Sequence, residues 1–292
     1  MNRLFYLIIL VALFAACHKD KNEDGATGKR ITNIAQTNTS NWVYSYDAQG
    51  RLQRIAPSPS YYILVEYMPN GMVMKSYNAS NVEQLPRYEF NIPDDKVIYC
   101  KAVLPNNKTK NNSYTYDAGG RLTQQNVFEY KTSTNEKKSD YITYFSYSGN
   151  NVNRVLYLST YVDTYDDHMR NDSIIIELEY YTDKKHFTWS DLGINCFGTA
   201  NTAADMLQSG QLYSPLPAEY YVTPEGMLPT GNPVKKRSKR EYRWNQGTKK
   251  WALFSTNSTT FPETDYANDA EGRLIKWAPW LVNLEWKQLL LF

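Results

Sequence analysis

One short phrase recurs along the chain and limits its possible folds more than any other feature. It reads Tyr-x-Tyr-Asp-x-x-Gly-Arg-Leu at residues 44–52 and 114–122, and its second half returns at residues 269–274. The two tyrosines are two positions apart, so they point to the same face of a strand. Asp favours a turn because its carboxylate accepts a bond from a nearby backbone N–H, and Gly supplies the positive φ of a tight hairpin. Each copy therefore predicts a β-hairpin.

The repeated Asp and Gly residues allow two interpretations. The carboxylates could belong to a metal or acid site, but turn chemistry explains them without any ligand. A degenerate copy of the phrase at residues 144–152 keeps the aromatic residues and a Gly but lacks the Asp. We therefore predict a structural role in turns for Asp47, Gly50, Asp117, Gly120 and Gly272.

Other segments show the same alternation between strands and turns. Ile174 and Ile176 share one face of a strand, for example, while Glu177 points the other way. Such segments recur roughly every 8–15 residues with turn signals between them, which predicts an all-β fold. We expect a long antiparallel meander, curled or barrel-like, in a single domain over residues 29–292. Thr202 and Asp205 have the form of a capping box before Gly210, so one short helix is expected near residues 202–209.

The N-terminus predicts export and lipid attachment. Residues 4–14 are apolar and uncharged, a run shorter than the roughly 20 residues that cross a bilayer as a helix. This run fits a signal peptide over residues 1–16, and Cys17 directly after two alanines resembles a lipobox. Cleavage before Cys17 would leave an acylated N-terminus, and residues 17–28 are polar enough to form a flexible tether.

The repeated phrase resembles the YD repeats of bacterial wall-associated and toxin-delivery proteins. Over residues 29–286 the chain more closely resembles a family of Bacteroidota lipoproteins of unknown function with a porin-like β fold. Lys19 followed by Asp20 also resembles the Bacteroidota signal that sends lipoproteins to the cell surface. These resemblances imply a lipid-anchored outer-membrane location facing the cell surface. They imply no activity and no functional residues.

Acidic and sulfur-bearing side chains give further candidate sites. Oxygen ligands crowd one predicted turn and could hold Ca²⁺, although a solvated hairpin tip explains them more simply; they are Asp163, Asp166, Asp167 and Asp172. Cys100 and Cys196 could form a disulfide in an oxidising compartment, or Cys100 could be a buried thiol. Ser173, between Asp172 and Ile174, resembles the acceptor of a short O-glycosylation motif of Bacteroidota.

The densest basic run could contact a polyanion such as lipopolysaccharide phosphate, or could be a solvated, Lys-bearing loop and strand start that discourages edge pairing. It consists of Lys235, Lys236, Arg237, Lys239 and Arg240. Tryptophans gather toward the C-terminus and could stack on sugar rings or pack across strands. They are Trp244, Trp251, Trp277, Trp280 and Trp286.

Composition argues against some classes of function but does not identify the function. The formal net charge is only +2, whereas a nucleic-acid-binding protein needs clustered positive charge. Beyond the tether, which contains His18, the only histidines are His168 and His186, neither in a nucleophile motif. We therefore predict a non-enzymatic surface lipoprotein without a cofactor, which binds or scaffolds a glycan or an envelope protein and contacts the membrane through its lipid. The alternatives are a polysaccharide-acting enzyme and an integral outer-membrane β-barrel.

Overall fold

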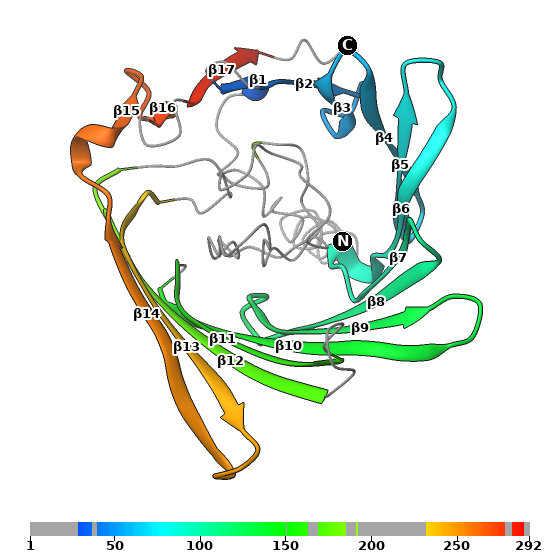
Figure 1. Cartoon of the computed structure of the whole chain (residues 1–292). Coiled ribbons are helices and arrows are strands. Elements are labelled where there is room, and N and C mark those ends of the chain that lie inside the picture. The colour runs from blue at the N-terminus through cyan, green and yellow to red at the C-terminus, as the bar shows by residue number, and fades with distance from the viewer. Residues whose placement is uncertain are drawn as a thin grey trace, which may run out of the picture.

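A single antiparallel sheet makes up almost all of the described chain. The computed structural model describes residues 29–36, 40–149, 151–162, 169–184, 191, 232–277 and 282–288. Within these ranges 17 strands form one sheet that curls round into a ring (Figure 1). The predicted all-β, curled meander is confirmed. The signal peptide, Cys17, the tether and the helix predicted near residues 202–209 lie outside the described residues.

The strands are β1 (Lys29–Gln36), β2 (Ser40–Tyr46), β3 (Leu52–Ser58), β4 (Tyr61–Met68), β5 (Gly71–Asn78), β6 (Glu83–Asn91), β7 (Tyr99–Leu104), β8 (Lys108–Tyr116), β9 (Leu122–Lys131), β10 (Glu136–Ser148), β11 (Asn151–Val162), β12 (Met169–Tyr180), β13 (Val234–Asn245), β14 (Lys250–Thr260), β15 (Tyr266–Asn268), β16 (Leu274–Trp277) and β17 (Val282–Gln288). Two short 3-10 helices, η2 (Pro93–Asp95) and η4 (Glu263–Asp265), interrupt them.

The order of pairing leaves one place where the ring stays open. Each strand from β1 to β14 pairs antiparallel with the next, as do β15 to β17, and β17 pairs antiparallel with β1. Strand directions that alternate in this way require β14 and β15 to run in the same direction. The chain therefore passes through η4 without reversing, and no ladder joins β14 to β15 in the described part of the chain.

The same alternation places every copy of the repeated phrase at one end of the ring. The turns at residues 47–51, 117–121 and 269–273 lie there together with the start of β1, and we call this end the turn rim. Two contacts tie β1 to the rim. Lys29 Nζ lies 2.7 Å from Glu271 Oε1, and Arg30 Nε lies 3.4 Å from the Gly50 carbonyl oxygen.

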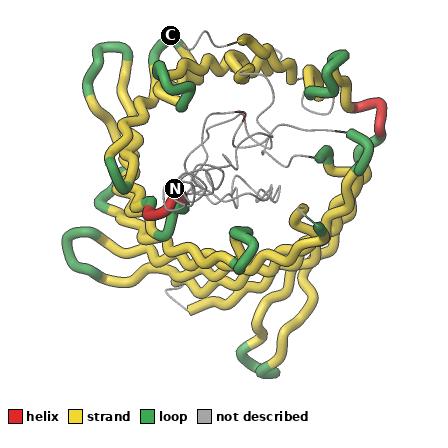
Figure 2. Tube along the Cα trace, turned by 180° about the vertical axis from the view of Figure 1, so that it is seen from behind, coloured by secondary structure: helices red, strands yellow, loops and turns green. Residues whose placement is uncertain are grey.

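The opposite end carries the turns that join each odd-numbered strand from β1 to β13 to the next strand, and we call it the tip end. The β13–β14 hairpin turns there and extends well beyond the ring in both views (Figures 1 and 2). Trp244 and Trp251 pack edge to face near its tip, with ring centroids 5.5 Å apart.

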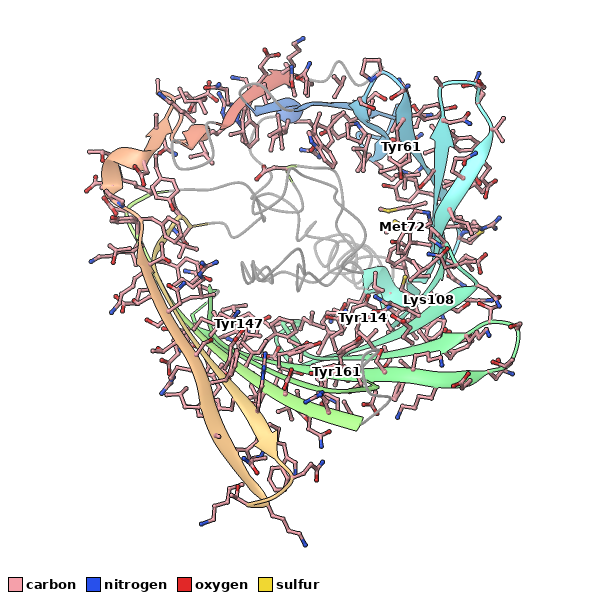
Figure 3. The ribbon with its side chains drawn as sticks, in the orientation of Figure 1. Tyr61, Met72, Lys108, Tyr114, Tyr147 and Tyr161 are labelled. Carbon is pink, nitrogen blue, oxygen red and sulfur yellow. The ribbon has the colours of Figure 1, made fainter. Side chains whose placement is uncertain are left out.

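The inner face of the ring differs between its two halves. Tyr61, Met72, Tyr114 and Tyr147 all point inward (Figure 3). The inner face of β1–β7, here the apolar wall, is almost entirely hydrophobic, and Ser76 is its one buried polar side chain among the described residues. The inner face of β8–β14, here the polar wall, mixes apolar side chains with Asn112, Gln125, Glu129, Ser139, Thr143, Ser159 and Glu241, all buried.

The outer face carries charged pairs that run across neighbouring strands. Outward positions follow from the two-residue period of each strand. The pairs include Lys75–Glu66 at 2.6 Å, Arg240–Glu177 at 2.9 Å and Lys236–Glu179 at 3.4 Å. Glu66 and Lys75 form a cross-strand pair on the exposed side of β4 and β5, and the carboxylate raises the pKa of Lys75 through a side-chain hydrogen bond.

Candidate functional site

The turns of the repeated phrase share one hydrogen-bond design. Asp47 Oδ1 accepts from the backbone N–H groups of Gln49, at 3.0 Å, and Arg51, at 2.9 Å. Asp47 Oδ2 accepts from Arg51 Nε at 2.8 Å. Gly50 closes the turn at a φ of 73°, which a residue with a side chain adopts only at a cost.

The other two copies repeat this design. Asp117 Oδ1 accepts from the Arg121 backbone N–H at 2.9 Å, and its Oδ2 accepts from Arg121 Nε at 2.7 Å. Asp269 binds Arg273 in the same way, at 2.9 Å for both bonds. Gly120 and Gly272 both take a φ of 79°. The three carboxylates therefore serve the turns, where the sequence predicts them, and are already engaged by Arg.

These bonds change the acidity of the Asp side chains. Hydrogen bonds from the Arg121 backbone and guanidinium lower the pKa of Asp117 below its usual value of 3.8. Partial burial would raise the pKa of Asp47 and Asp269, but the hydrogen bonds from Arg51 and Arg273 outweigh it, so both pKa values are also lowered. The turns are thus stabilised by the charged form of each Asp.

Each turn Arg also stacks on an aromatic ring from the second strand along the meander. The guanidinium carbon lies 4.2 Å from the ring centroid for Arg51 and Tyr67, 5.1 Å for Arg121 and Tyr147, and 5.6 Å for Arg273 and Trp286. The repeated Arg therefore joins its own turn to the next hairpin.

Aromatic side chains near the rim fasten each hairpin to its neighbour through a main-chain carbonyl. The bonds are Tyr46 to Ile31 at 2.5 Å, Tyr116 to Val97 at 2.8 Å, Tyr147 to Leu122 at 2.7 Å, Tyr180 to Val152 at 2.8 Å, Tyr266 to Val234 at 2.7 Å and Trp286 to Leu274 at 2.8 Å. Burial raises the pKa of Tyr46 and Tyr147, so both hydroxyls remain donors. We call these contacts the aromatic latches. Sequence reasoning missed them, although Tyr46 and Tyr116 stand directly before a turn Asp.

The polar wall brings charged groups inward on several strands. Glu129 is 8 % exposed and lies 3.0 Å from Lys108 Nζ and 3.4 Å from Lys110 Nζ. Glu241 accepts from Ser255 Oγ at 2.7 Å and lies 2.6 Å from Lys239 Nζ. Burial lowers the pKa of Lys239, although Glu241 opposes this effect.

Aromatic rings and a further carboxylate complete this wall. Tyr141 and Tyr157 stack with their centroids 5.7 Å apart, and Tyr161 donates to Asp172 Oδ2 at 3.1 Å. Hydroxyl, amide, ammonium and carboxylate groups beside aromatic faces suit the hydroxyl-rich, ring-shaped surface of a sugar. The polar wall is therefore the candidate binding surface.

The predicted basic run lies within β13, not in a loop. Lys236 and Arg240 point outward to Glu179 and Glu177 on β12, while Lys239 points inward to Glu241. Lys235 lies over the Tyr181 ring at 5.9 Å. Most of this run is thus matched by acids or an aromatic ring across the sheet.

The other predicted sites are scattered. Asp163, Asp166, Asp167 and Cys196 lie outside the described residues, so the calcium and disulfide predictions stay predictions; in the described part, no group of three or more His, Cys, Asp or Glu side chains is placed to hold a metal ion. Cys100 is buried on β7. Ser173 is 8 % exposed in the middle of β12, a position with little access for a glycosyltransferase.

The C-terminal tryptophans do not form one platform. Trp244 and Trp251 meet at the β13–β14 tip, whereas Trp286 is latched to Leu274 under Arg273. Trp280 lies outside the described residues. Among the tryptophan side chains that the structure describes, a sugar-binding role therefore reduces to the pair at the hairpin tip.

Comparison with solved structures shows the fold. A porin-like protein from Bacteroides vulgatus superposes with a TM-score of 0.56 at 12 % identity, covering 89 % of this chain and all, 100 %, of its own. A porin-like protein from Bacteroides uniformis is a weaker match, with a TM-score of 0.33 at 11 % identity over 80 % of this chain and 96 % of its own. No family model matches the chain, and no curated protein matches it. The porin-like β fold is thus shown, while membership of the lipoprotein family and the YD-repeat likeness stay predictions.

Proposed function

We propose that the protein is an outer-membrane lipoprotein, anchored through Cys17 and facing the cell surface, which binds a glycan or an envelope partner without catalysing a reaction. The observation that carries this proposal is the set of ion pairs across the outer face of the ring, Lys75–Glu66 and Arg240–Glu177 among them. A barrel embedded in lipid needs an apolar outer band about 25 Å tall. Charged pairs in that position favour a ring in water, which needs a separate anchor.

The anchor would leave from the turn rim. β1 begins there, held by Lys29 to Glu271, and residues 17–28 connect it to Cys17. These residues can span at most about 40 Å when fully extended. The turn rim therefore faces the membrane, and the tip end with the β13–β14 hairpin faces away from it.

The polar wall supports binding over catalysis. A glycoside hydrolase needs two carboxyl groups facing each other across the scissile bond. On the polar wall Glu129 lies between Lys108 and Lys110, and Glu241 is held by Lys239 and Ser255. Carboxylates already engaged by ammonium and hydroxyl groups suit a surface that orients a polar ligand. Among the described residues no helix has both the length and the apolar character to cross a membrane.

Labelling with a lipid precursor in cells tests the anchor. We expect the label on the wild-type chain and its loss in Cys17→Ala, with Cys100→Ala as the matched control that keeps the label. Label that persists in Cys17→Ala would contradict the anchor. Binding is tested separately, by applying the Cys17→Ala chain to a glycan array beside the same chain carrying Tyr141→Ala and Tyr157→Ala. Equal signals from the two chains would remove the polar wall as the sugar-binding surface.

A further inference from the structure

The strand β14 has a long edge that nothing in the described chain covers. It pairs with β13 along its length, and no ladder forms on its other side in the described residues. From Lys250 to Thr260 every residue is exposed except Ser255 and Thr259, which are half-buried. Such an edge presents a row of unpaired N–H and C=O groups that template pairing with another strand.

This edge lacks the usual charged protection. Proteins guard edge strands with Lys, Pro or inward charges, yet residues 251–260 contain no charged residue and no Pro. Its neighbour β13 is strongly basic, with Lys235, Lys236 and Arg237 in succession. A bulge at Phe254 bends the first part of β14, but residues 255–260 keep a regular ladder with β13.

We propose that two copies of this chain associate through their β14 edges, paired antiparallel about a two-fold axis at Ser258, so that Ser258 of one copy lies opposite Ser258 of the other. A two-fold interface sets each residue against the same strand of the partner copy, so any charge on the edge would repel itself. The uncharged stretch from Ser255 to Thr260 meets this condition and allows Ser and Thr side chains to pair across the interface.

Exposed apolar side chains extend the same contact. Leu253 is 57 % exposed and Phe254 is 55 % exposed, immediately before the uncharged stretch. Burial of these side chains adds to the backbone bonds of the paired edges.

The pairing has a consequence that rests on the proposed anchor. Antiparallel strands place the turn rim of one copy beside the tip end of the other, so the two lipid anchors leave from opposite ends. This arrangement fits molecules on two apposed surfaces, whose β13–β14 hairpins overlap between them.

Light scattering on the unlipidated Cys17→Ala chain tests the association without reference to the anchor. We expect dimers at concentrations of tens of micromolar, and Ser258→Glu should weaken them by about tenfold or more, which is roughly 1.4 kcal/mol. Glu at this position faces Ser238 and lies near Lys236 and Arg240 within its own chain, so the monomer should stay folded. Thr115→Glu, an exposed site on a strand paired on both sides, is the matched control and should dimerise normally.

A mixture of Ser258→Glu and Ser258→Lys chains provides the rescue, since opposite charges now meet across the axis. We expect the mixture to recover dimers that neither variant forms alone. A Cys17→Ala chain that carries no further substitution and stays monomeric at about 100 micromolar, well above the tens of micromolar at which we expect dimers, would overturn the proposal. So would a Ser258→Glu chain that dimerises as tightly as Thr115→Glu.

Discussion

The two walls of the inner face are built from the same kind of strand but hold the ring together differently. On the apolar wall, Ile55, Met72 and Met74 are fully buried and stabilise the sheet by removing apolar surface from water. On the polar wall, Asn112, Gln125 and Glu129 occupy equivalent inward positions. There stability must come from hydrogen bonds and ion pairs, each with a small net contribution.

This difference separates a closely packed half from the half that we propose for ligand binding. A closely packed apolar wall tolerates little change in volume. A polar wall offers groups that can exchange their partners for a ligand. The turn rim serves both halves, because the aromatic latches recur from Tyr46 on β2 to Trp286 on β17.

Truncation in the apolar wall should have the largest effect. Ile55→Ala removes a side chain that is 0 % exposed, and we expect a loss of about 2–4 kcal/mol in the free energy of unfolding. Thr143→Ala, 2 % exposed on the polar wall, is the partner measurement and should cost about 1 kcal/mol. Urea unfolding of both variants gives the comparison. Similar losses for the two would mean that the walls do not differ in how they stabilise the ring.

A close backbone contact in the apolar wall gives the next largest effect. A Cβ at Gly71 would lie 2.4 Å from the Phe90 carbonyl oxygen, so Gly71→Ala must push β5 away from β6. We expect a loss of about 1–3 kcal/mol, measured as a lower midpoint of thermal unfolding. Gly119→Ala is the control, because its nearest neighbour is the Asp117 side chain at 3.3 Å. An unchanged midpoint for Gly71→Ala would mean that there is room for a Cβ at Gly71 beside the Phe90 carbonyl oxygen.

Removing one aromatic latch should have a smaller effect. Tyr116→Phe deletes the hydroxyl that donates to the Val97 carbonyl, and we expect a loss of about 0.5–1.5 kcal/mol in denaturant unfolding. Tyr62→Phe removes an exposed bond to Asn81 and should cost less. A Tyr116→Phe chain as stable as Tyr62→Phe would remove the latches from this account.

Acid should weaken the turn rim slightly and selectively. The pKa of Asp117 is lowered in the folded chain, so its contribution is complete above the ordinary value of 3.8 and is lost as the pH falls through the folded value. Asp117→Asn keeps an acceptor for the backbone but cannot titrate. We expect the wild-type chain to lose more stability than this variant between about pH 6 and pH 3. Urea unfolding of both chains at the two pH values gives the measurement. Equal losses of stability for the two chains would mean that the charged form of Asp117 does not stabilise its turn.

Much of the fold could be read from local patterns. Asp47, Asp117 and Asp269 lie at chain reversals because their turn chemistry is local and complete within a few residues. The two-residue alternation around Ile174 and Ile176 likewise located β12. Such features need no knowledge of distant partners.

Features that depend on distant partners could not be predicted. β13 continues through Lys235–Arg240 because Glu177 and Glu179 on β12 match its outward charges, which no local pattern reveals. The polar wall exists only because β8 to β14 curl to one side. The non-reversing passage at η4 likewise depends on how β17 pairs with β1.

The most direct test of the account is whether the ring is stable in water without its lipid. We expect the Cys17→Ala chain to purify without detergent and to show a β-sheet circular dichroism spectrum with a cooperative thermal transition. Detergent should leave that transition unchanged, because the outer-face pairs such as Lys75–Glu66 already lie in water. A chain that aggregates without detergent and folds only in micelles would contradict the account and favour a ring embedded in the membrane.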